Sequence, residues 1–227
     1  MKTKHYSRLK EEVPKYKASI TSTITIFGGP SLYFHQKALE WQQKDFLSDK
    51  HIEYVYAMLV SWGMHRMGAR GAKMPDYETF KESILSQKEK LDNLRYKSIE
   101  NIKQGEEIAI IKTLSDICFS IKGTTSKSYI VSSSKTLAHI LPNLVCPIDR
   151  QYTCQFFEVS NKEPETKIFE EVIKTMWSFY QDPDRIQLLS PILGKPFNEN
   201  YPKIFDNLII EYVKVNFPKI QKKKQKK

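Results

Sequence analysis

The chain has 227 residues, of which 40% are hydrophobic and 12% are aromatic. This composition is typical of a globular domain and excludes a disordered chain. The longest apolar runs are far shorter than the roughly 20 residues that cross a bilayer, and no apolar segment follows the lysines of residues 1–16. We therefore expect a soluble, intracellular protein of the cytoplasm, associated with the nucleoid if it binds DNA.

The charge balance is strongly basic. Lysine and arginine together number 36 against 26 for Asp and Glu, which gives a formal net charge of +10. Such a surface favours a polyanionic partner, nucleic acid (DNA above all) first and anionic membrane second. Part of the excess lies in residues 219–227, which we expect to form a disordered lysine-rich tail. The alternative is a lysine-rich surface that serves solubility alone.

The three cysteines, Cys118, Cys146 and Cys154, form neither an even set nor a C-x-x-C pair. Their number and spacing indicate reduced, partly buried thiols. The histidines show no pair at the i,i+4 spacing of helical zinc ligands and no regular coupling to the cysteines. We therefore expect no metal site and no cofactor.

Hydrophobic periodicity predicts an all-α fold of about eight to ten helices. Residues 20–27 alternate Ile with Thr and Ser, which is compatible with a strand or an irregular arm. Residues 51–67 leave almost no polar face and predict a buried central helix, beginning after Ser48 or Asp49 and ending at glycines 68–71. The other predicted helices cover 31–46, 76–94, 110–121 with Gly123 as C-cap, 135–141 stopped by Pro142, 168–180 between Pro164 and Asp182, and 204–213 with Asn200 as N-cap.

The organisation is simple, because no internal repeat or linker divides the chain. We assign residues 1–218 to a single mainly helical domain, with two closely packed lobes as the alternative. Residues 219–227 form the tail.

Three serines precede Lys135, and we expect them at the N-terminus of the 135–141 helix. Hydroxyl and N–H groups at a helix N-terminus are suited to binding a phosphate. The predicted DNA contacts are Ser132, Ser133, Ser134, Lys127 and Arg150. The alternative is an ordinary serine N-cap followed by a solvent-facing lysine.

Asp149 stands at the start of another predicted helix, either as an ordinary N-cap or as a functional carboxylate. The 135–141 helix rises only about 9 Å, and residues 142–148 span up to about 23 Å when extended. The loop is therefore long enough to return Asp149 to Lys135. A lysine amine beside a carboxylate is suited to attack on C1′ of a nucleotide, giving a Schiff base, while the carboxylate helps to deprotonate the lysine and stabilises the cationic sugar.

Enzymes that excise a base flip it into a pocket with aromatic or apolar walls. Our candidates for such a base pocket are Trp62, His65 and Trp41. The alternative is core packing for the two tryptophans and a structural role for the histidine.

The stretch SSSKTLAHILPNLVCPIDRQYT resembles the catalytic segment of the helix-hairpin-helix DNA glycosylases. In that superfamily a hairpin leads into a lysine-led helix, and a Pro-x-Asp after a short loop opens the next helix. The resemblance places Lys135 on the Schiff-base lysine of the bifunctional members and Asp149 on the catalytic aspartate. It implies a two-lobed all-α fold and a DNA glycosylase acting on a damaged or modified base, with lyase activity at abasic sites.

The chain departs from that pattern in three ways. Serines 132–134 stand where the superfamily hairpin is glycine-rich, the spacing from Lys135 to Asp149 is several residues shorter, and no four-cysteine iron–sulfur motif is present. Residues 31–157 are also similar to uncharacterised bacterial and archaeal proteins that share a Ser-Trp-Gly-x-His helix and a Pro-x-Asp-Arg turn. That second likeness implies no activity.

Two other classes of function stay open. A non-enzymatic nucleic-acid-binding protein would bind through phosphate contacts and the lysine tail, and its affinity would fall steeply with salt. An interaction protein with an acidic partner would not bind nucleic acid at physiological salt.

Overall fold

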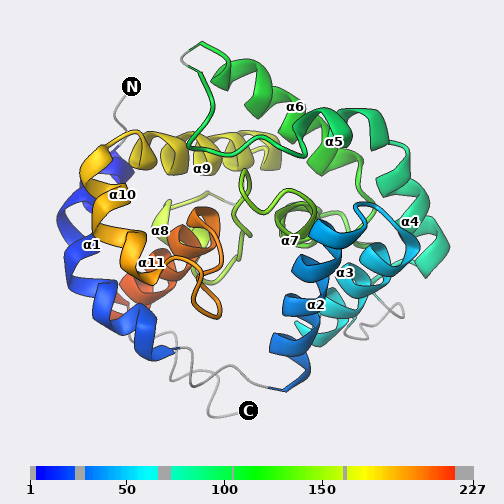
Figure 1. Ribbon diagram of the computed structural model, residues 1–227, viewed down its shortest axis with the longest axis horizontal. Helices are drawn as coiled ribbons and strands as arrows, with labels where there is room; N and C mark the ends of the chain where they lie inside the picture. Colours follow the sequence, from blue (N-terminus) through cyan, green and yellow to red (C-terminus); the bar gives the residue numbers. More distant parts are fainter. Residues whose placement is uncertain (1–3, 24–28, 66–72, 104, 161–162, 218–227) are drawn as a thin grey trace.

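The computed structural model describes residues 4–23, 29–65, 73–103, 105–160 and 163–217, and within these ranges it contains helices and no strand (Figure 1). The all-α prediction is confirmed, with twelve helices where eight to ten were expected. They are α1 (Lys4–Thr23), α2 (Pro30–Lys44), α3 (Asp49–Ser61), α4 (Tyr77–Leu85), α5 (Lys88–Leu94), α6 (Glu107–Ser120), α7 (Ile130–Ile140), α8 (Thr153–Phe156), α9 (Glu165–Tyr180), α10 (Pro183–Leu189), the 3-10 turn η2 (Ser190–Ile192) and α11 (Tyr201–Asn216). None of these helices is long and apolar enough to cross a membrane.

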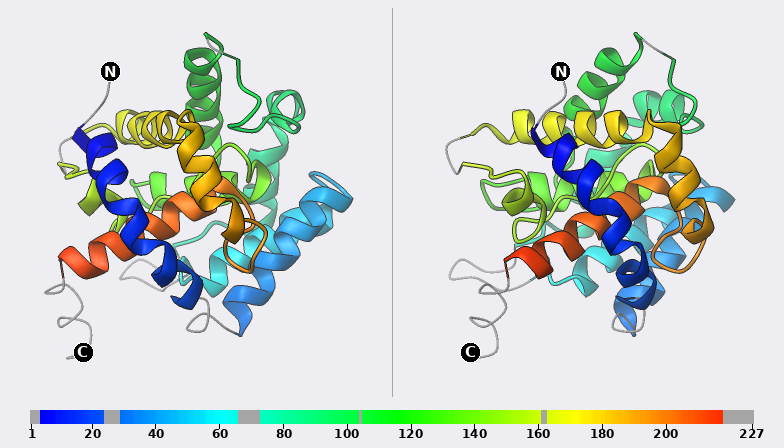
Figure 2. Two further views of the ribbon diagram at one scale, coloured as in Figure 1. Left: turned by 60° about the vertical axis from the view of Figure 1, so that its left-hand side comes forward. Right: turned by 90° about the vertical axis from the view of Figure 1, so that its left-hand side faces the viewer.

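The helices form two groups with α7 between them. In the first group α1 packs on α9 and α11, and α8 and α10 complete it. In the second group α2 packs along α3, which also contacts α4. Figures 1 and 2 show α1 beside α11 at one side of the molecule and the α2–α3 pair at the other. A single cluster of buried side chains runs through both groups, from Leu9 to Val213.

The N-terminal segment differs from its prediction. Residues 20–23 belong to α1, so the expected strand or arm is wrong there, and residues 24–27 lie outside the described residues. Leu9, Tyr16 and Ile20 are buried on one face of α1. Their spacing of seven and four residues follows the helical period, which the local alternation of Ile with Thr and Ser masks.

The helix α3 ends earlier than expected, at Ser61. Gly63 has a φ of 79°, its N–H bonds to the Val60 carbonyl at 2.9 Å, and the Met64 N–H bonds to the Leu59 carbonyl at 3.0 Å. This is a Schellman motif, for which glycine is the favoured residue. The expected end at glycines 68–71 is therefore wrong, and the turn places Trp62 at the end of the helix. The predicted Ser48 N-cap is confirmed by a bond from the His51 N–H.

The central helix is α7 and not α3, because α7 contacts α2, α3, α6 and α9. Ten of its residues are buried, including three serines, a threonine, a lysine and a histidine. Buried hydroxyl groups donate hydrogen bonds to carbonyl groups of the helix backbone. Thr136 Oγ1, for example, donates to the Ser132 carbonyl at 2.9 Å. The pattern of apolar residues in the sequence therefore does not predict that α7 is buried.

The helices α2, α6, α9 and α11 lie close to their predicted ranges, whereas α10 was not predicted. Asn200 is confirmed as the N-cap of α11, accepting from the Lys203 N–H, and α9 begins after Pro164 as expected. The predicted helix 76–94 is divided into α4 and α5, with Asp76 as the N-cap of the first. The tail 219–227 lies outside the described residues.

Gly123 is not the C-cap of α6, since the cap is Ile121 in extended conformation. The glycine is needed for a close approach instead. A Cβ built on Gly123 would lie 2.9 Å from both Cβ and Oγ of Ser132 and 3.3 Å from its carbonyl carbon.

We expect Gly123→Ala to lower the free energy of unfolding by about 1–3 kcal/mol, because the connector must move away from α7. Urea unfolding measures this loss. The control is Lys122→Ala, an exposed neighbour in the same connector, which is expected to change stability by less than about 0.5 kcal/mol. If Gly123→Ala unfolds at the wild-type urea concentration, the close approach carries no packing energy.

Candidate functional site

A cavity of about 350 Å³ lies between the two groups of helices, a volume at the small end of ligand pockets. Residues from α1, α2, α3, α7 and α11 line it, together with the segment from Pro147 to Tyr152. The lining of the cavity therefore combines elements that are far apart in the sequence. Lys135 and Asp149 both line this cavity.

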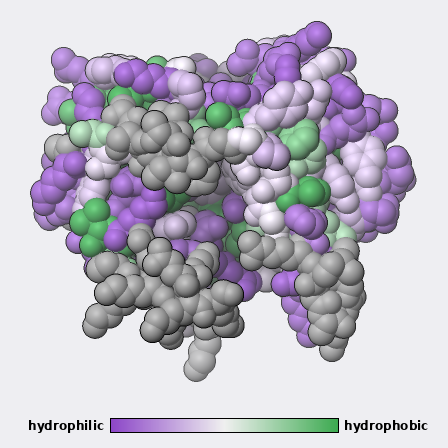
Figure 3. Space-filling view, turned by 90° about the horizontal axis from the view of Figure 1, so that it is seen from below, coloured by the Kyte–Doolittle hydropathy of each residue, from purple (hydrophilic) through white to green (hydrophobic). Residues whose placement is uncertain are grey.

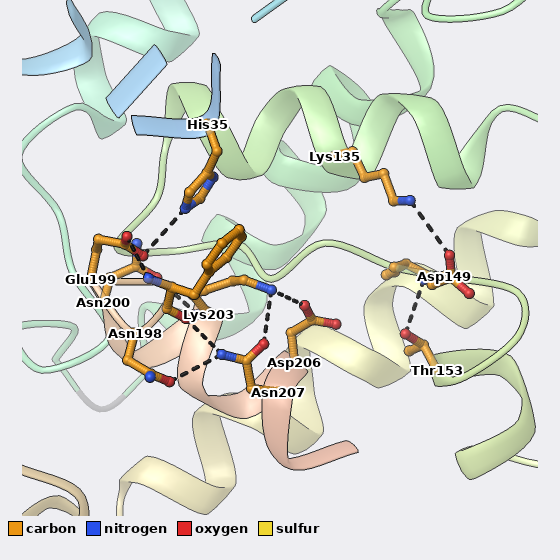
Figure 4. A network of polar contacts seen from close by, with 12 residues as sticks. His35, Lys135, Asp149, Thr153, Asn198, Glu199, Asn200, Lys203, Asp206 and Asn207 are labelled. Carbon is orange, nitrogen blue, oxygen red and sulfur yellow. Dashed lines mark hydrogen bonds and ion pairs between the residues drawn. The ribbon is translucent and has the colours of Figure 1, made fainter. Parts of the chain in front are cut away.

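Lys135 and Asp149 meet, which the length of the loop between them allows. Their Nζ and Oδ2 atoms lie 3.5 Å apart, and Figure 4 shows the lysine extending from α7 toward the carboxylate. The Lys135 side chain is 10% exposed and that of Asp149 is 34% exposed. The Lys135 ammonium also lies over the Trp62 ring, 5.3 Å from its centroid, a cation–π arrangement. The pair is thus held at the boundary between the core and the cavity.

The Asp149 carboxylate is held by its own turn. Its Oδ1 accepts from the Gln151 N–H at 2.7 Å, and its backbone N–H donates to Thr153 Oγ1 at 3.0 Å. The helix after it is α8, which begins at Thr153 rather than at Asp149. Because Oδ1 serves the turn, Oδ2 is the oxygen that faces Lys135.

The three predicted phosphate-binding serines lie inside α7 and are buried, so the expected serine-lined helix entrance is wrong. Ser132 Oγ donates to the Tyr129 carbonyl and Ser133 Oγ to the Ile121 carbonyl. Ser134 Oγ accepts from the Ile148 N–H at 3.0 Å. Their role is structural: Ser133 ties α7 to α6, and Ser134 holds the loop that carries Asp149.

The N-terminus of α7 is occupied by a carboxylate from α9. Glu165 Oε2 accepts from the N–H groups of Tyr129 and Ile130 at 2.8 and 3.1 Å. Ser128 Oγ donates to Glu165 Oε1. An acidic side chain thus takes the place where the helix dipole favours an anion.

The two basic residues predicted to contact DNA lie at the surface. Lys127 is exposed in the connector between α6 and α7. The Arg150 side chain is 65% exposed, with Nη2 3.9 Å from Glu165 Oε1 and hydrogen-bonded to Ser128 Oγ. Both remain available to a partner outside the cavity.

Of the three predicted wall residues, only Trp62 lines the cavity. Trp41 lies elsewhere on α2, beneath the Lys44 ammonium and 6.4 Å from the Tyr54 ring. His65 is exposed in the turn after α3, with Nδ1 2.7 Å from the Val60 carbonyl oxygen. The prediction that Trp41 and His65 line the base pocket is therefore wrong. His65 lies outside the cavity because α3 ends four residues before it, and Trp41 packs near Tyr54 instead.

The sequence interpretation missed a second polar cluster, on α11. Lys203 Nζ lies 2.6 Å from Asp206 Oδ2 and 2.9 Å from Asn207 Oδ1 (Figure 4). The Lys203 and Asp206 side chains are 11% and 6% exposed. All three residues line the cavity, as does Phe197. The signal that the sequence offered for this cluster was a lysine and an aspartate three residues apart in an amphipathic helix.

A chain of histidines lies behind the aromatic walls. His139 Nδ1 lies 2.8 Å from the Lys135 carbonyl oxygen, which can only accept, so Nδ1 carries a proton. Burial, reinforced by nearby His35, lowers the pKa of His139 well below its usual value. His139 is therefore neutral, and its Nε2 accepts from His35 Nδ1 at 2.8 Å.

The other ring nitrogen of His35 lies 3.3 Å from Glu199 Oε2. Burial raises the pKa of Glu199, but the hydrogen bond from His35 and its charge outweigh burial and lower it. The His35 ring stacks on Phe197, with centroids 5.1 Å apart, and on Trp62, with centroids 6.0 Å apart. One imidazole thus supports both aromatic walls of the cavity.

The burial of His51 leads us to expect that the folded protein loses stability in acid. It accepts from the Leu47 N–H through Nδ1, and its Nε2 lies 3.3 Å from the His139 carbonyl oxygen, so the neutral ring satisfies both contacts. Burial lowers its pKa to about 4. Because the unfolded chain takes up a proton near pH 6.5 and the folded chain does not, stability is complete above pH 6.5 and falls between 6.5 and about 4. We expect this group to contribute a loss of about 3 kcal/mol at pH 4.

Urea unfolding between pH 4 and 7 measures the loss, and His51→Gln provides the comparison. The amide preserves one acceptor and one donor but does not titrate, so the variant is expected to show a shallower pH dependence. Equal slopes in the two proteins would contradict the assignment of this loss to His51.

The three thiols are free, as expected. Burial raises the pKa values of Cys118 and Cys146, which keeps both protonated. Among the described residues, no three His, Cys, Asp or Glu side chains converge as metal ligands. Comparison with known proteins found no matching family model, curated protein or solved structure.

Proposed function

We propose that the protein is a DNA glycosylase of the helix-hairpin-helix type, with Schiff-base lyase activity, acting on a damaged or modified base. The observation that carries the proposal is the 3.5 Å approach of Lys135 Nζ to Asp149 Oδ2 at the edge of the 350 Å³ cavity. The volume suits one flipped base rather than a stretch of duplex. The aromatic side chains of Trp62, Phe197 and Tyr152 supply the flat walls that a base requires.

In the proposed reaction Lys135 gives a proton to Asp149 and its neutral amine attacks C1′. The bond between C1′ and the base breaks, and the base leaves with the electron pair and takes up the proton held by Asp149, which restores the carboxylate. The Asp149 carboxylate stabilises the positive charge that develops on the sugar. The C1′–O4′ bond then breaks, O4′ takes up a proton from the lysine nitrogen, and the opened sugar is joined to Lys135 as a Schiff base at C1′, which water hydrolyses.

The arrangement of the helices supports a two-lobed fold of that superfamily. The N-terminal helix α1 joins α8–α11 in one group, α2–α4 form the other, and the cavity opens between them, while α6 packs on α7 and α9. The connector between α6 and α7 takes the place of the hairpin, with Gly123 as its one glycine. The exposed Lys127 lies in this connector, the exposed Arg150 contacts it through Ser128, and both are suited to phosphate contacts.

The surface is compatible with a polyanionic partner. On the face shown in Figure 3, hydrophilic side chains dominate the outer margins and hydrophobic ones form only small separate groups among the described residues. A large apolar docking patch is therefore not visible on this face. This favours a nucleic acid over an apolar protein partner.

Borohydride trapping on a duplex with a single abasic site tests the chemistry. We expect a covalent adduct with the wild-type chain and none with Lys135→Ala, since only an amine forms the reducible imine. Lys88→Ala is the matched control, because Lys88 also pairs with an aspartate, Asp92 at 3.1 Å, but on the exposed surface. An adduct of equal yield in Lys135→Ala, or no adduct with any of these proteins, contradicts the proposal.

A second candidate is a nucleic-acid-binding protein without catalysis, favoured by the net charge of +10 and the lysines of residues 219–227. It predicts DNA binding that falls steeply with salt and is mostly lost when residues 219–227 are deleted. Affinity that survives the deletion would favour the structured site.

A further inference from the structure

The charged side chains that line the cavity sum to one negative charge. Two lysines, Lys135 and Lys203, face three carboxylates, Asp149, Asp206 and Glu211. The positive excess of the chain therefore lies outside the cavity. A phosphate would be repelled on entering, so an uncharged group fits inside better than an anion.

The Lys203–Asp206 pair has one donor and one acceptor to spare. An ammonium has three hydrogens, and within the described residues Lys203 Nζ is given two acceptors, Asp206 and Asn207. Asp206 receives Lys203 on Oδ2, which leaves Oδ1 for another donor. In Figure 4 this second oxygen points away from Lys203, toward the side of the cavity where Asp149 lies. The wall thus presents an ammonium hydrogen beside a carboxylate oxygen.

Phe197 is held next to this pair in a costly conformation. Its φ is 61°, a region that residues other than glycine rarely adopt. Glu199 Oε1 accepts from the Phe197 N–H at 2.7 Å, and Asn207 Nδ2 donates to its carbonyl at 2.6 Å. Strain that is fixed by its surroundings clusters at ligand sites. Here it keeps a flat ring at the cavity beside Lys203, whose Nζ lies 5.8 Å from the Phe197 centroid.

We propose that Lys203 and Asp206 recognise the edge of a flipped base that carries a ring N–H next to a carbonyl group, the lactam edge of guanine-, hypoxanthine- and uracil-type bases. Asp206 Oδ1 accepts from the ring N–H, and the third hydrogen of Lys203 is donated to the carbonyl oxygen. Both bonds are charge-assisted. This assignment of the substrate class rests on the proposed function.

Adenine- and cytosine-type bases fit the pair less well. They place an exocyclic amine and a bare ring nitrogen at this edge. The amine is a weaker donor to a carboxylate than the acidic ring N–H. The ring nitrogen offers one lone pair to Lys203 where a carbonyl oxygen offers two. The lactam edge therefore makes the stronger pair of bonds.

Hypoxanthine and adenine are matched probes, since the two free bases differ only at this edge. Saturation-transfer NMR on the full chain measures the affinity for each. We expect hypoxanthine to bind about tenfold more tightly than adenine. The double variant Lys203→Met/Asp206→Leu is expected to lose that preference. Because it removes both charges together, it leaves no buried ion unpaired.

The control is Lys50→Gln/Glu53→Gln, which removes a lysine–acid pair of the same i,i+3 spacing, 3.0 Å apart but exposed on α3. It is expected to keep the preference. Equal binding of the two bases by the wild type, or a preference that survives in the Lys203/Asp206 variant, would overturn the assignment.

Trapping on abasic DNA separates this inference from the function on which it rests, because an abasic site has no base to recognise. An adduct without a hypoxanthine preference would overturn the role of Lys203 and Asp206 and leave the lyase chemistry supported. A hypoxanthine preference without an adduct would support base recognition and contradict the Schiff-base step.

Discussion

Asp149→Asn is expected to slow base release by about 10²–10⁴-fold, the usual contribution of a positioned acid–base group. The amide can no longer take the proton from Lys135 or stabilise the positive sugar. Its side-chain oxygen still accepts from the Gln151 N–H, so the turn that holds residue 149 is preserved. Single-turnover base release from a duplex carrying one hypoxanthine or uracil measures the effect.

The same variant should be trapped on a preformed abasic site with a smaller loss than it shows in base release. At such a site the base has already left, so only the formation of the imine needs Asp149. The control is Asp182→Asn, another aspartate that accepts from a nearby backbone N–H, that of Asp184 at 3.2 Å, and does not line the cavity. Base release at the wild-type rate in Asp149→Asn would exclude a catalytic role for the carboxylate.

Asp206→Leu is expected to produce the largest loss of stability, about 3–5 kcal/mol. Among the described residues, the substitution leaves the Lys203 ammonium, 11% exposed, with the Asn207 side-chain oxygen as its remaining hydrogen-bond acceptor. Adding Lys203→Met should restore most of the stability, because a hydrophobic pair of similar volume removes the uncompensated charge. Urea unfolding of the two variants and the wild type gives both differences.

The comparison of single and double variants decides the interpretation. If the double variant is no more stable than Asp206→Leu, the loss comes from cavity formation and not from a stranded charge. The pair Lys214–Glu211 is not a suitable control, because Glu211 is buried and lines the cavity. Glu53→Leu on the surface of α3 is suitable and is expected to change stability by less than about 0.5 kcal/mol.

The sequence predicts helices well where their apolar stripe is local. The α9 and α11 helices have regular stripes and recognisable boundaries at Pro164 and Asn200, and both agree with the structure. The approach of Lys135 to Asp149 was shown from the sequence to be possible, because the loop of seven residues is long enough, but the loop length does not require it. These are properties of short stretches of chain.

What the sequence did not predict depends on contacts between distant segments. The serines of α7 are buried because Ile121, Tyr129 and Ile148 supply their hydrogen-bond partners. The N-terminus of α7 is filled by Glu165 from another helix. Lys203 lies on the polar side of the stripe of α11 and becomes buried only when Phe197 and the cavity walls close around it. In each case the partner decides the role of the residue.

The packing of α1 on α11 sets the order in which this protein can be assembled. Tyr16 and Asn216 are joined by a hydrogen bond of 2.9 Å across 200 residues of chain, and Ile20 of α1 and Ile210 of α11 both line the cavity. A ribosome adding 5–20 residues per second takes about 10–40 s to cover that separation. The first helix can pack on α9 before the end of this time, but until α11 is made it lacks its larger contact and the cavity lacks a wall. Lys135 is therefore synthesised well before its pocket exists, and the nascent chain gains its reactive site only when synthesis of the last helix is complete.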